Sequence, residues 1–230
     1  MTRIHTVVLD MAGTTVVDEG LVEEAFARAW DRGPYLERAI DPATTRESAI
    51  QHVRDTMGQS KIEVFRALVP EEDAQALNAA FEAAYDELVA EGRSLGIAGA
   101  EQAIRDLRAQ GRKVVLTTGF ARRTADGIVA SLGWEGLPDL VLTPADAGRG
   151  RPHPDLNLTA LIRTGAPSVE AIAVVGDTAS DVASGLTAGA GLVAGVLTGM
   201  LSREELEAAG AHQVLASVAE LPDLLERLGR

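Results

Sequence analysis

Short runs of apolar, mostly β-branched residues recur along the chain and alternate with stretches of helical spacing. They lie at residues 113–118 (KVVLTT), 139–144 (DLVLTP), 171–177 (AIAVVGD) and 191–197 (GLVAGVL), and one more spans Thr6–Asp10. Runs this short and this apolar, separated by helices, are typical of buried parallel strands. The pattern therefore predicts an α/β fold built on a doubly wound parallel sheet.

A different pattern occupies residues 19–93. Segments such as LVEEAFARAW, TRESAIQHVRDTM, KIEVFRAL and EEDAQALNAAFEAAYDELVAEG all have helical spacing, and none reads as a strand. The segment EGRSLGIAGAEQ that follows carries three glycines and no strong periodicity, which indicates a hinge. We therefore expect a core domain of residues 1–18 and 94–230 and an inserted α-helical domain of residues 19–93.

Polar side chains fall where the predicted strands end, which is the edge at which such sheets bind ligands. Asp10, Thr118 and Asp177 all have this position. Asp10 taken alone is equally compatible with a strand-terminal cap. Asp181 follows Asp177 on a helix predicted to begin near Ala179, so both carboxylates can turn toward one cation. Oxygen ligands from Asp10, Asp177 and a backbone carbonyl suit octahedral Mg²⁺.

Two further segments offer groups that hold phosphate oxygens. Thr118 and Gly119 supply a hydroxyl and backbone N–H groups at a predicted helix start. Arg151, between Gly150 and Pro152, supplies a fixed guanidinium. Each segment alone is compatible with an ordinary loop, but together with the acidic segments they indicate a phosphoryl-transfer site.

The composition of the chain limits the classes of partner that we expect. The net charge of -13 argues against nucleic acid or an anionic membrane as the main partner, while an anionic small substrate stays compatible with locally concentrated positive charge. The chain has no Cys, which removes thiolate chemistry and favours a hard cation. We find no long apolar run and no tripartite leader, so we expect a cytoplasmic protein without a membrane span.

The motifs DMAGT, TTG, GRP and GDTASD resemble those of the haloacid dehalogenase superfamily of phosphoryl-transfer hydrolases, and the helical insertion resembles its mobile cap. The resemblance implies that Asp10 is a nucleophile that forms an aspartyl phosphate. It implies that Thr118 and Arg151 hold the phosphoryl group, and that Asp10, Asp177 and the Ala12 carbonyl bind Mg²⁺. Supporting positions are Gly119 and Met57 at the substrate, and Asp181 and Thr14 behind the metal.

The second residue after the nucleophile departs from the ordinary phosphatases of this superfamily. They carry an acid there that protonates the leaving alkoxide, whereas this chain has Ala12. Lys61, one of two lysines, follows Ser60, a predicted N-cap. Near a helix N-terminus and desolvated under a closed cap, Lys61 should have a lowered pKa. The alternative is a solvated helix lysine.

An uncharged Lys61 amine can form a Schiff base with a carbonyl, and a carbonyl β to phosphorus then lets the carbon–phosphorus bond break without an acid at position 12. Ala12 and the loop MGQSK resemble phosphonoacetaldehyde hydrolases, or phosphonatases. This implies hydrolysis of phosphonoacetaldehyde or a related phosphonate, and possible dimerisation through the cap. Phosphonatases typically have His three residues after the lysine and Tyr after the Thr-Gly pair, where this chain has Val64 and Phe120.

Other functions are compatible with the same motifs. A phosphomonoesterase acting on a small phosphorylated metabolite would not depend on Lys61. A phosphosugar mutase would need the proton-shuttling side chain that Ala12 lacks. A phosphoacceptor switch would use Asp10 as its modified residue, but a large insertion that excludes water favours catalysis.

Overall fold

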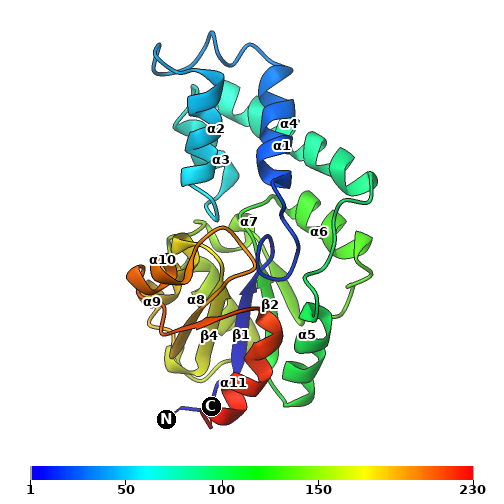
Figure 1. Ribbon diagram of the computed structural model, residues 1–230, viewed down its shortest axis with the longest axis vertical. Helices are drawn as coiled ribbons and strands as arrows, with labels where there is room; N and C mark the ends of the chain where they lie inside the picture. Colours follow the sequence, from blue (N-terminus) through cyan, green and yellow to red (C-terminus); the bar gives the residue numbers. More distant parts are fainter. Residues whose placement is uncertain (1, 230) are drawn as a thin grey trace.

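The computed structural model describes residues 2–229, within which a six-stranded parallel sheet forms the lower half of the molecule (Figure 1). Its strand order is β3-β2-β1-β4-β5-β6. The predicted doubly wound parallel sheet is confirmed, since β1 to β5 coincide with the apolar runs. The strands are β1 (Thr6–Asp10), β2 (Lys113–Thr117), β3 (Leu140–Leu142), β4 (Ile172–Gly176), β5 (Leu192–Val196) and β6 (Gln213–Leu215).

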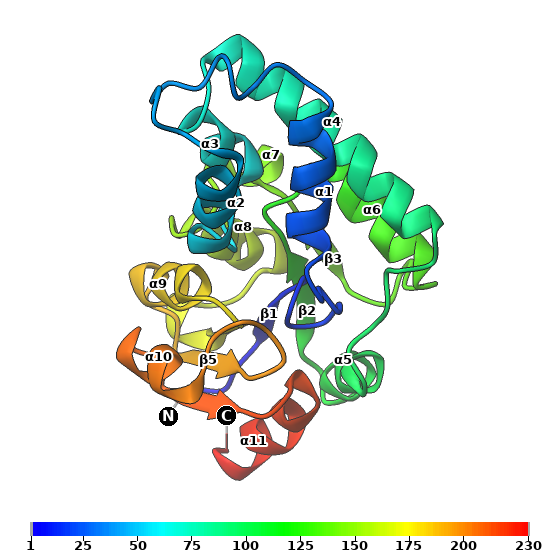
Figure 2. The same cartoon turned by 45° about the horizontal axis from the view of Figure 1, so that its top comes forward.

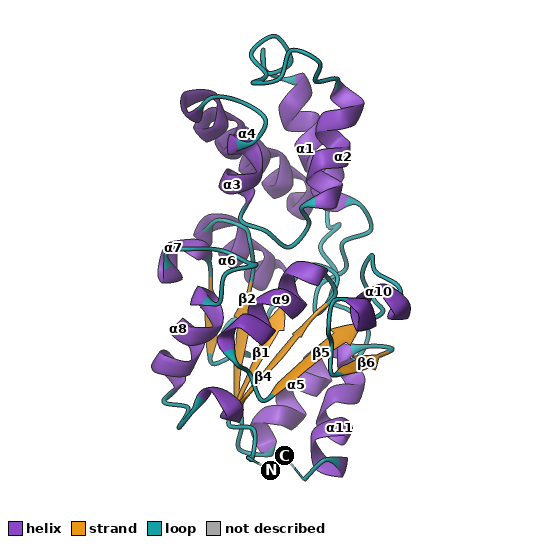
Figure 3. Ribbon diagram, turned by 90° about the vertical axis from the view of Figure 1, so that its left-hand side faces the viewer, coloured by secondary structure: helices purple, strands orange, loops and turns teal. Residues whose placement is uncertain are grey.

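Helices cover both faces of this sheet, so its central strands are buried on both sides (Figure 3). Val7 and Leu9 of β1 pack in one hydrophobic cluster with residues of α5 and α11. Val8 points the other way, into a second cluster with residues of α8, α9 and α10. The helices of this part are α5 (Ala100–Ala109), α6 (Arg122–Ser131), α7 (Pro144–Ala147), α8 (Asp155–Thr164), α9 (Ala179–Ala188), α10 (Arg203–Ala208) and α11 (Leu221–Arg227), with short 3-10 turns at Val169–Ala171 and Val218–Glu220.

Four helices lie together above the carboxyl edge of the sheet, with α1 alongside α4 (Figure 2). Aromatic rings hold them together: Phe65 stacks on Phe26 at 5.7 Å between ring centroids and meets Phe81 edge-on at 5.5 Å. The sequence predicted these helices and no strand among them. They are α1 (Leu21–Asp31), α2 (Arg46–Asp55), α3 (Lys61–Arg66) and α4 (Glu71–Ala90), and we keep the name cap for them.

Two chain segments connect the cap to the sheet and run side by side. The Val17 N–H donates to the Leu95 carbonyl at 2.8 Å, and the Ile97 N–H donates to the Thr15 carbonyl at 2.9 Å. The domain boundaries at residues 18 and 94 stay a prediction, but the paired crossing lies beside them. Among the described residues no helix is long and apolar enough to cross a membrane.

Candidate active site

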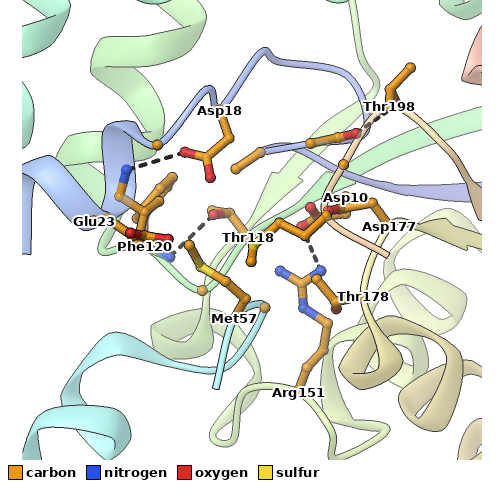
Figure 4. A pocket seen from close by; sticks show the side chains of 18 of the residues that line it. Asp10, Asp18, Glu23, Met57, Thr118, Phe120, Arg151, Asp177, Thr178 and Thr198 are labelled. Atoms are coloured by element: carbon orange, nitrogen blue, oxygen red, sulfur yellow. Dashed lines mark hydrogen bonds and ion pairs between the residues drawn. The ribbon is translucent and has the colours of Figure 1, made fainter. Parts of the chain in front are cut away.

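A cavity of about 310 Å³ lies between the carboxyl edge of the sheet and the cap (Figure 4). Residues from the ends of β1, β4 and β5, from the loop after β2, and from the start of α3 line it. The structure thus brings together segments that are far apart in the sequence. Every candidate site residue predicted from the sequence lines this cavity, except Thr14 and Asp181, which lie behind it.

Asp10, at the last position of β1, is held by the guanidinium of Arg151. Nη1 of Arg151 lies 2.5 Å from Oδ1 of Asp10 and also donates to Asp181. All three side chains are at most 5% exposed. Burial raises the pKa of Asp10 to about 7, Arg151 opposes the rise and Asp181 adds to it. The predicted nucleophile therefore sits in a site where a further cation would stabilise its carboxylate form.

Three buried carboxylates form a cluster that can hold a divalent cation. Oxygen atoms of Asp10, Asp177 and Asp181 all lie within 4.8 Å of one another. Burial and the neighbouring carboxylate of Asp10 raise the pKa of Asp177 well above its usual range. Oxygen donors at such spacing fit a hard cation, which would relieve the repulsion between the carboxylates.

Small residues and a hydroxyl fix the carboxylate of Asp177. The Thr14 hydroxyl donates to Asp177 Oδ1 at 3.1 Å. A Cβ atom at Gly13 or Gly199 would overlap the same carboxylate, so only glycine leaves room for it at these positions. Thr198, next to Gly199, donates its hydroxyl to the Gly13 carbonyl at 2.7 Å and closes this side of the site.

Asp181 is anchored at the start of α9, which begins at the predicted residue, Ala179. Its Oδ2 accepts hydrogen bonds from the Thr178 N–H at 3.1 Å and from the Thr178 hydroxyl at 2.5 Å. Its Oδ1 accepts from Arg151. Asp181 therefore orients Arg151, and both oxygens of its carboxylate already have protein partners.

The turn after β2, where the sequence predicts phosphate binding, differs in part from the prediction. The Thr118 N–H donates to the Leu142 carbonyl at 3.2 Å, and the Phe120 N–H donates to the Thr118 hydroxyl oxygen at 3.2 Å. The expected helix start at this turn is wrong, because α6 begins only at Arg122. The groups left for a phosphate are the Thr118 hydroxyl hydrogen and the Gly119 N–H.

Lys61 enters the site from the cap as the first residue of α3. Its N–H donates to the Gly119 carbonyl at 3.2 Å, and its Nζ lies 5.8 Å from the centroid of the Phe120 ring. The side chain is buried, which lowers its pKa to about 8, while the charge of Asp18 opposes the fall. This pKa agrees with the expected desolvation. Ser60 occupies the predicted N-cap position, although its side chain makes no capping bond.

The cap loop before Lys61 rests directly on the sheet part of the molecule. A Cβ atom at Gly58 would meet the Thr178 hydroxyl at 2.5 Å, and one at Gly119 would overlap the Gln59 carbonyl. A Cβ atom at Gly150 would come within 2.8 Å of Ser60. Three glycines thus permit a close approach, and the structure shows the cap seated on the site.

Several lining residues were not predicted from the sequence. Thr198 lies two residues after the end of β5, so a search of the loops after the predicted strands would have found it too. Asp18 and Glu23 line the side of the cavity next to the cap. Nothing in their sequence context indicates a site. They line the cavity because α3 packs beside α1 in the folded protein.

The fold and the site together indicate the protein family. The chain belongs to the haloacid dehalogenase-like hydrolases, a family whose pattern matches residues 4–189. The protein is therefore a hydrolase of that superfamily, as the four motifs predicted.

Relatives within the superfamily point to a narrower group. The chain is 32% identical to a phosphonoacetaldehyde hydrolase from Bacillus cereus, over 78% of this chain and 71% of the relative. It is 30% identical to the bifunctional phosphonoacetaldehyde hydrolase/aminoethylphosphonate transaminase of Clostridioides difficile (strain 630), over 98% of this chain but only 40% of that longer protein. The crystal structure of a phosphonoacetaldehyde hydrolase-like protein from Oleispira antarctica has the same fold, with a TM-score of 0.79 at 24% identity, and covers 100% of this chain and 94% of that one.

Proposed function

We propose that this protein is a Mg²⁺-dependent hydrolase that cleaves the carbon–phosphorus bond of phosphonoacetaldehyde or a related phosphonate with a carbonyl β to phosphorus. One observation carries the proposal. A buried lysine with a pKa of about 8 faces the same cavity as a buried aspartate, and the position two residues after that aspartate is Ala12. The cavity therefore offers an amine where an ordinary phosphatase offers an acid. The names of the relatives agree with this choice.

The amine of Lys61 starts the reaction. Its lone pair adds to the substrate carbonyl, water leaves, and the resulting iminium withdraws electrons from the neighbouring carbon. A carboxylate oxygen of Asp10 then attacks phosphorus. The electrons of the carbon–phosphorus bond move to the iminium and give an enamine. Water hydrolyses the aspartyl phosphate to phosphate, and protonation and hydrolysis of the enamine release acetaldehyde and free Lys61.

The remaining groups hold the transferred phosphoryl group. Arg151, the Thr118 hydroxyl and the Gly119 N–H are the donors available to its oxygens. Asp10, Asp177 and the Ala12 carbonyl would hold Mg²⁺, which supplies positive charge against the phosphoryl oxygens. Met57 lines the cavity next to Lys61, where an apolar side chain excludes water from the imine.

Trapping the imine tests this function. With Mg²⁺ and phosphonoacetaldehyde, we expect equal release of phosphate and acetaldehyde, and inactivation by borohydride only when the substrate is present. Lys61→Arg should abolish both, and Asp10→Asn should abolish product release. Lys113→Arg is the matched control, because Lys113 is the other lysine and is exposed in an ion pair with Asp139.

A different result would identify the protein as an ordinary phosphatase. Phosphate release from common phosphate esters that persists in Lys61→Arg, with no turnover of phosphonoacetaldehyde, would mean that the protein is a phosphomonoesterase. Lys61 would then have a structural role.

A further inference from the structure

Imine chemistry needs a group that exchanges protons with the lysine and with the departing oxygen, and the cavity offers few. Asp10 and Asp177 are assigned to phosphorus and the metal, and the Arg151 guanidinium stays protonated. Glu23 is held by Arg54 in an exposed ion pair, with 2.5 Å between Oε2 and Nη2. These groups are therefore committed to other partners.

Two residues near Lys61, Val64 and Phe120, do not fill this role. Val64, one helical turn further along α3, is buried and carries no polar side-chain atom. Phe120, over whose ring the Lys61 ammonium lies, offers only an aromatic face. A proton carrier for Lys61 must come from a different segment that lines the cavity.

Asp18 has the geometry for it. The Val22 N–H donates to Asp18 Oδ1 at 3.2 Å, which pins the carboxylate at the start of α1 and leaves Oδ2 without a described protein partner. Figure 4 shows the Asp18 carboxylate directed into the cavity on the side of Phe120 and Thr118. Glu19, the neighbouring acid, is exposed to solvent.

The charges of Asp18 and Lys61 each affect the pKa of the other, as a pair that exchanges a proton requires. Among the charged groups that affect the pKa of Lys61, Asp18 comes first, ahead of Arg151 and Asp10. Burial raises the pKa of Asp18, while the Val22 N–H and the charge of Lys61 lower it and Glu23 raises it. The Tyr85 hydroxyl of α4 is also buried without a hydrogen-bond partner among the described residues, and its pKa is raised by burial first and then by the charges of Asp18 and Asp10.

We propose that Asp18 is the general base and acid of the imine-forming half of the reaction. This inference rests on the proposed function. It assigns a catalytic role to a residue outside the four motifs, at the point where the chain enters the cap.

The proton balance of the step closes within the pair. Because no carboxylate oxygen of the described residues lies within 4.0 Å of Lys61 Nζ, the Asp18 carboxylate takes a proton from the Lys61 ammonium through one water. The free amine then adds to the carbonyl carbon as the carbon–oxygen π bond breaks. The proton on nitrogen passes to oxygen and gives a carbinolamine. The Asp18 carboxyl then donates its proton to the hydroxyl, which leaves as water while the nitrogen lone pair forms the iminium. Asp18 ends as a carboxylate, as it began, and the same transfers in reverse hydrolyse the imine.

Asp18→Asn is the variant that isolates this role. The Asn side-chain oxygen can still accept the Val22 N–H, so the start of α1 is preserved, but the amide carries no exchangeable acid proton. Asp55→Asn makes the same change of charge on the exposed face of α2 and serves as the control. Asp18→Glu keeps the acid and should restore part of the activity.

Two measurements separate the halves of the reaction. The rate of borohydride inactivation with phosphonoacetaldehyde reports the imine, and oxygen exchange between ¹⁸O-labelled phosphate and water reports phosphoryl transfer to Asp10. For Asp18→Asn we expect inactivation and kcat/KM to fall at least about tenfold, as for the loss of a general acid–base. The exchange should stay within about twofold, and the pH profile of kcat/KM should lose the limb that belongs to Asp18.

Two results would overturn the assignment. Asp18→Asn could keep imine trapping within about twofold of the native rate with an unchanged pH profile, or it could lose oxygen exchange and trapping equally, which is the behaviour of a structural residue. A failure of the proposed function is distinct, because the native protein itself would then resist borohydride, and Asp18 would have no imine to serve.

Discussion

Replacing Lys61 by Met should stabilise the protein while it abolishes phosphonate hydrolysis. Lys61 is 5% exposed, and its ammonium has no ion pair with a carboxylate within 4.0 Å among the described residues. Burial of this group lowers its pKa from 10.5 to about 8, which means that the folded protein holds the charged form at a cost. Methionine has a similar length and no charge, so it removes the cost and keeps most of the packing.

The magnitude follows from the pKa shift. Each pKa unit corresponds to about 1.4 kcal/mol, so the shift of Lys61 from 10.5 to about 8 amounts to roughly 3 kcal/mol at pH 7. Between pH 8 and 10.5 the unfolded chain binds more protons than the folded one, so the stability of the native protein rises with pH in this window. The advantage of Lys61→Met should therefore shrink to about 2 kcal/mol at pH 9.

Urea unfolding of both proteins at pH 7 and pH 9, without added Mg²⁺, measures this difference. Lys113→Met is the control: the Lys113 side chain is 51% exposed and lies 2.9 Å from Asp139, so its loss should leave stability unchanged or slightly lower. The reasoning is refuted if Lys61→Met is no more stable than the native protein at pH 7. It is also refuted if the gap is the same at both pH values, because Lys61 would then not be a desolvated ammonium.

Three further predictions concern activity. The kcat/KM of the native enzyme for phosphonoacetaldehyde should fall as the pH rises through about 8, because the Lys61–Asp18 pair then loses the proton that the carbinolamine hydroxyl needs in order to leave; a profile that is flat between pH 6 and 9 contradicts this. Gly119→Ala should lower kcat/KM at least about tenfold while the circular dichroism stays native, since the new methyl group overlaps the Gln59 carbonyl and lifts the cap loop. Asp177→Asn should weaken Mg²⁺ activation at least about tenfold in a metal titration, and unchanged activation would exclude Asp177 as a ligand.

The sequence predicts the central part of the sheet well because the strands there have no solvent-facing side. β1, β4 and β5 are buried along their whole length, so they read as continuous apolar runs. β6, at Gln213–Leu215, was missed because a polar, exposed Gln begins its three residues, whereas β3, equally short and at the opposite edge, is wholly apolar (LVL) and was predicted. A short edge strand of this kind has the same pattern as a loop.

Some residues of the site could be predicted from the sequence and others could not. Asp10 is the last residue of β1 and Asp177 directly follows β4, so topology alone brings them together at one edge. Asp18 owes its position to tertiary packing: it faces Lys61 only because α3 comes down beside α1. No local pattern predicts such a pair, and the turn after Thr118 likewise depends on its bond to Leu142, which lies on a neighbouring strand.

Closure of the cap and the reactivity of Lys61 depend on the same contact. The Lys61 N–H donates to the Gly119 carbonyl, so the residue that we propose as the amine is fixed to the turn that we propose binds phosphate. If the cap lifts, this bond breaks, water reaches the ammonium, and the pKa of Lys61 returns toward 10.5. At neutral pH the amine is then almost fully protonated. The closed arrangement therefore raises the fraction of Lys61 that is free amine at neutral pH by more than about a hundredfold.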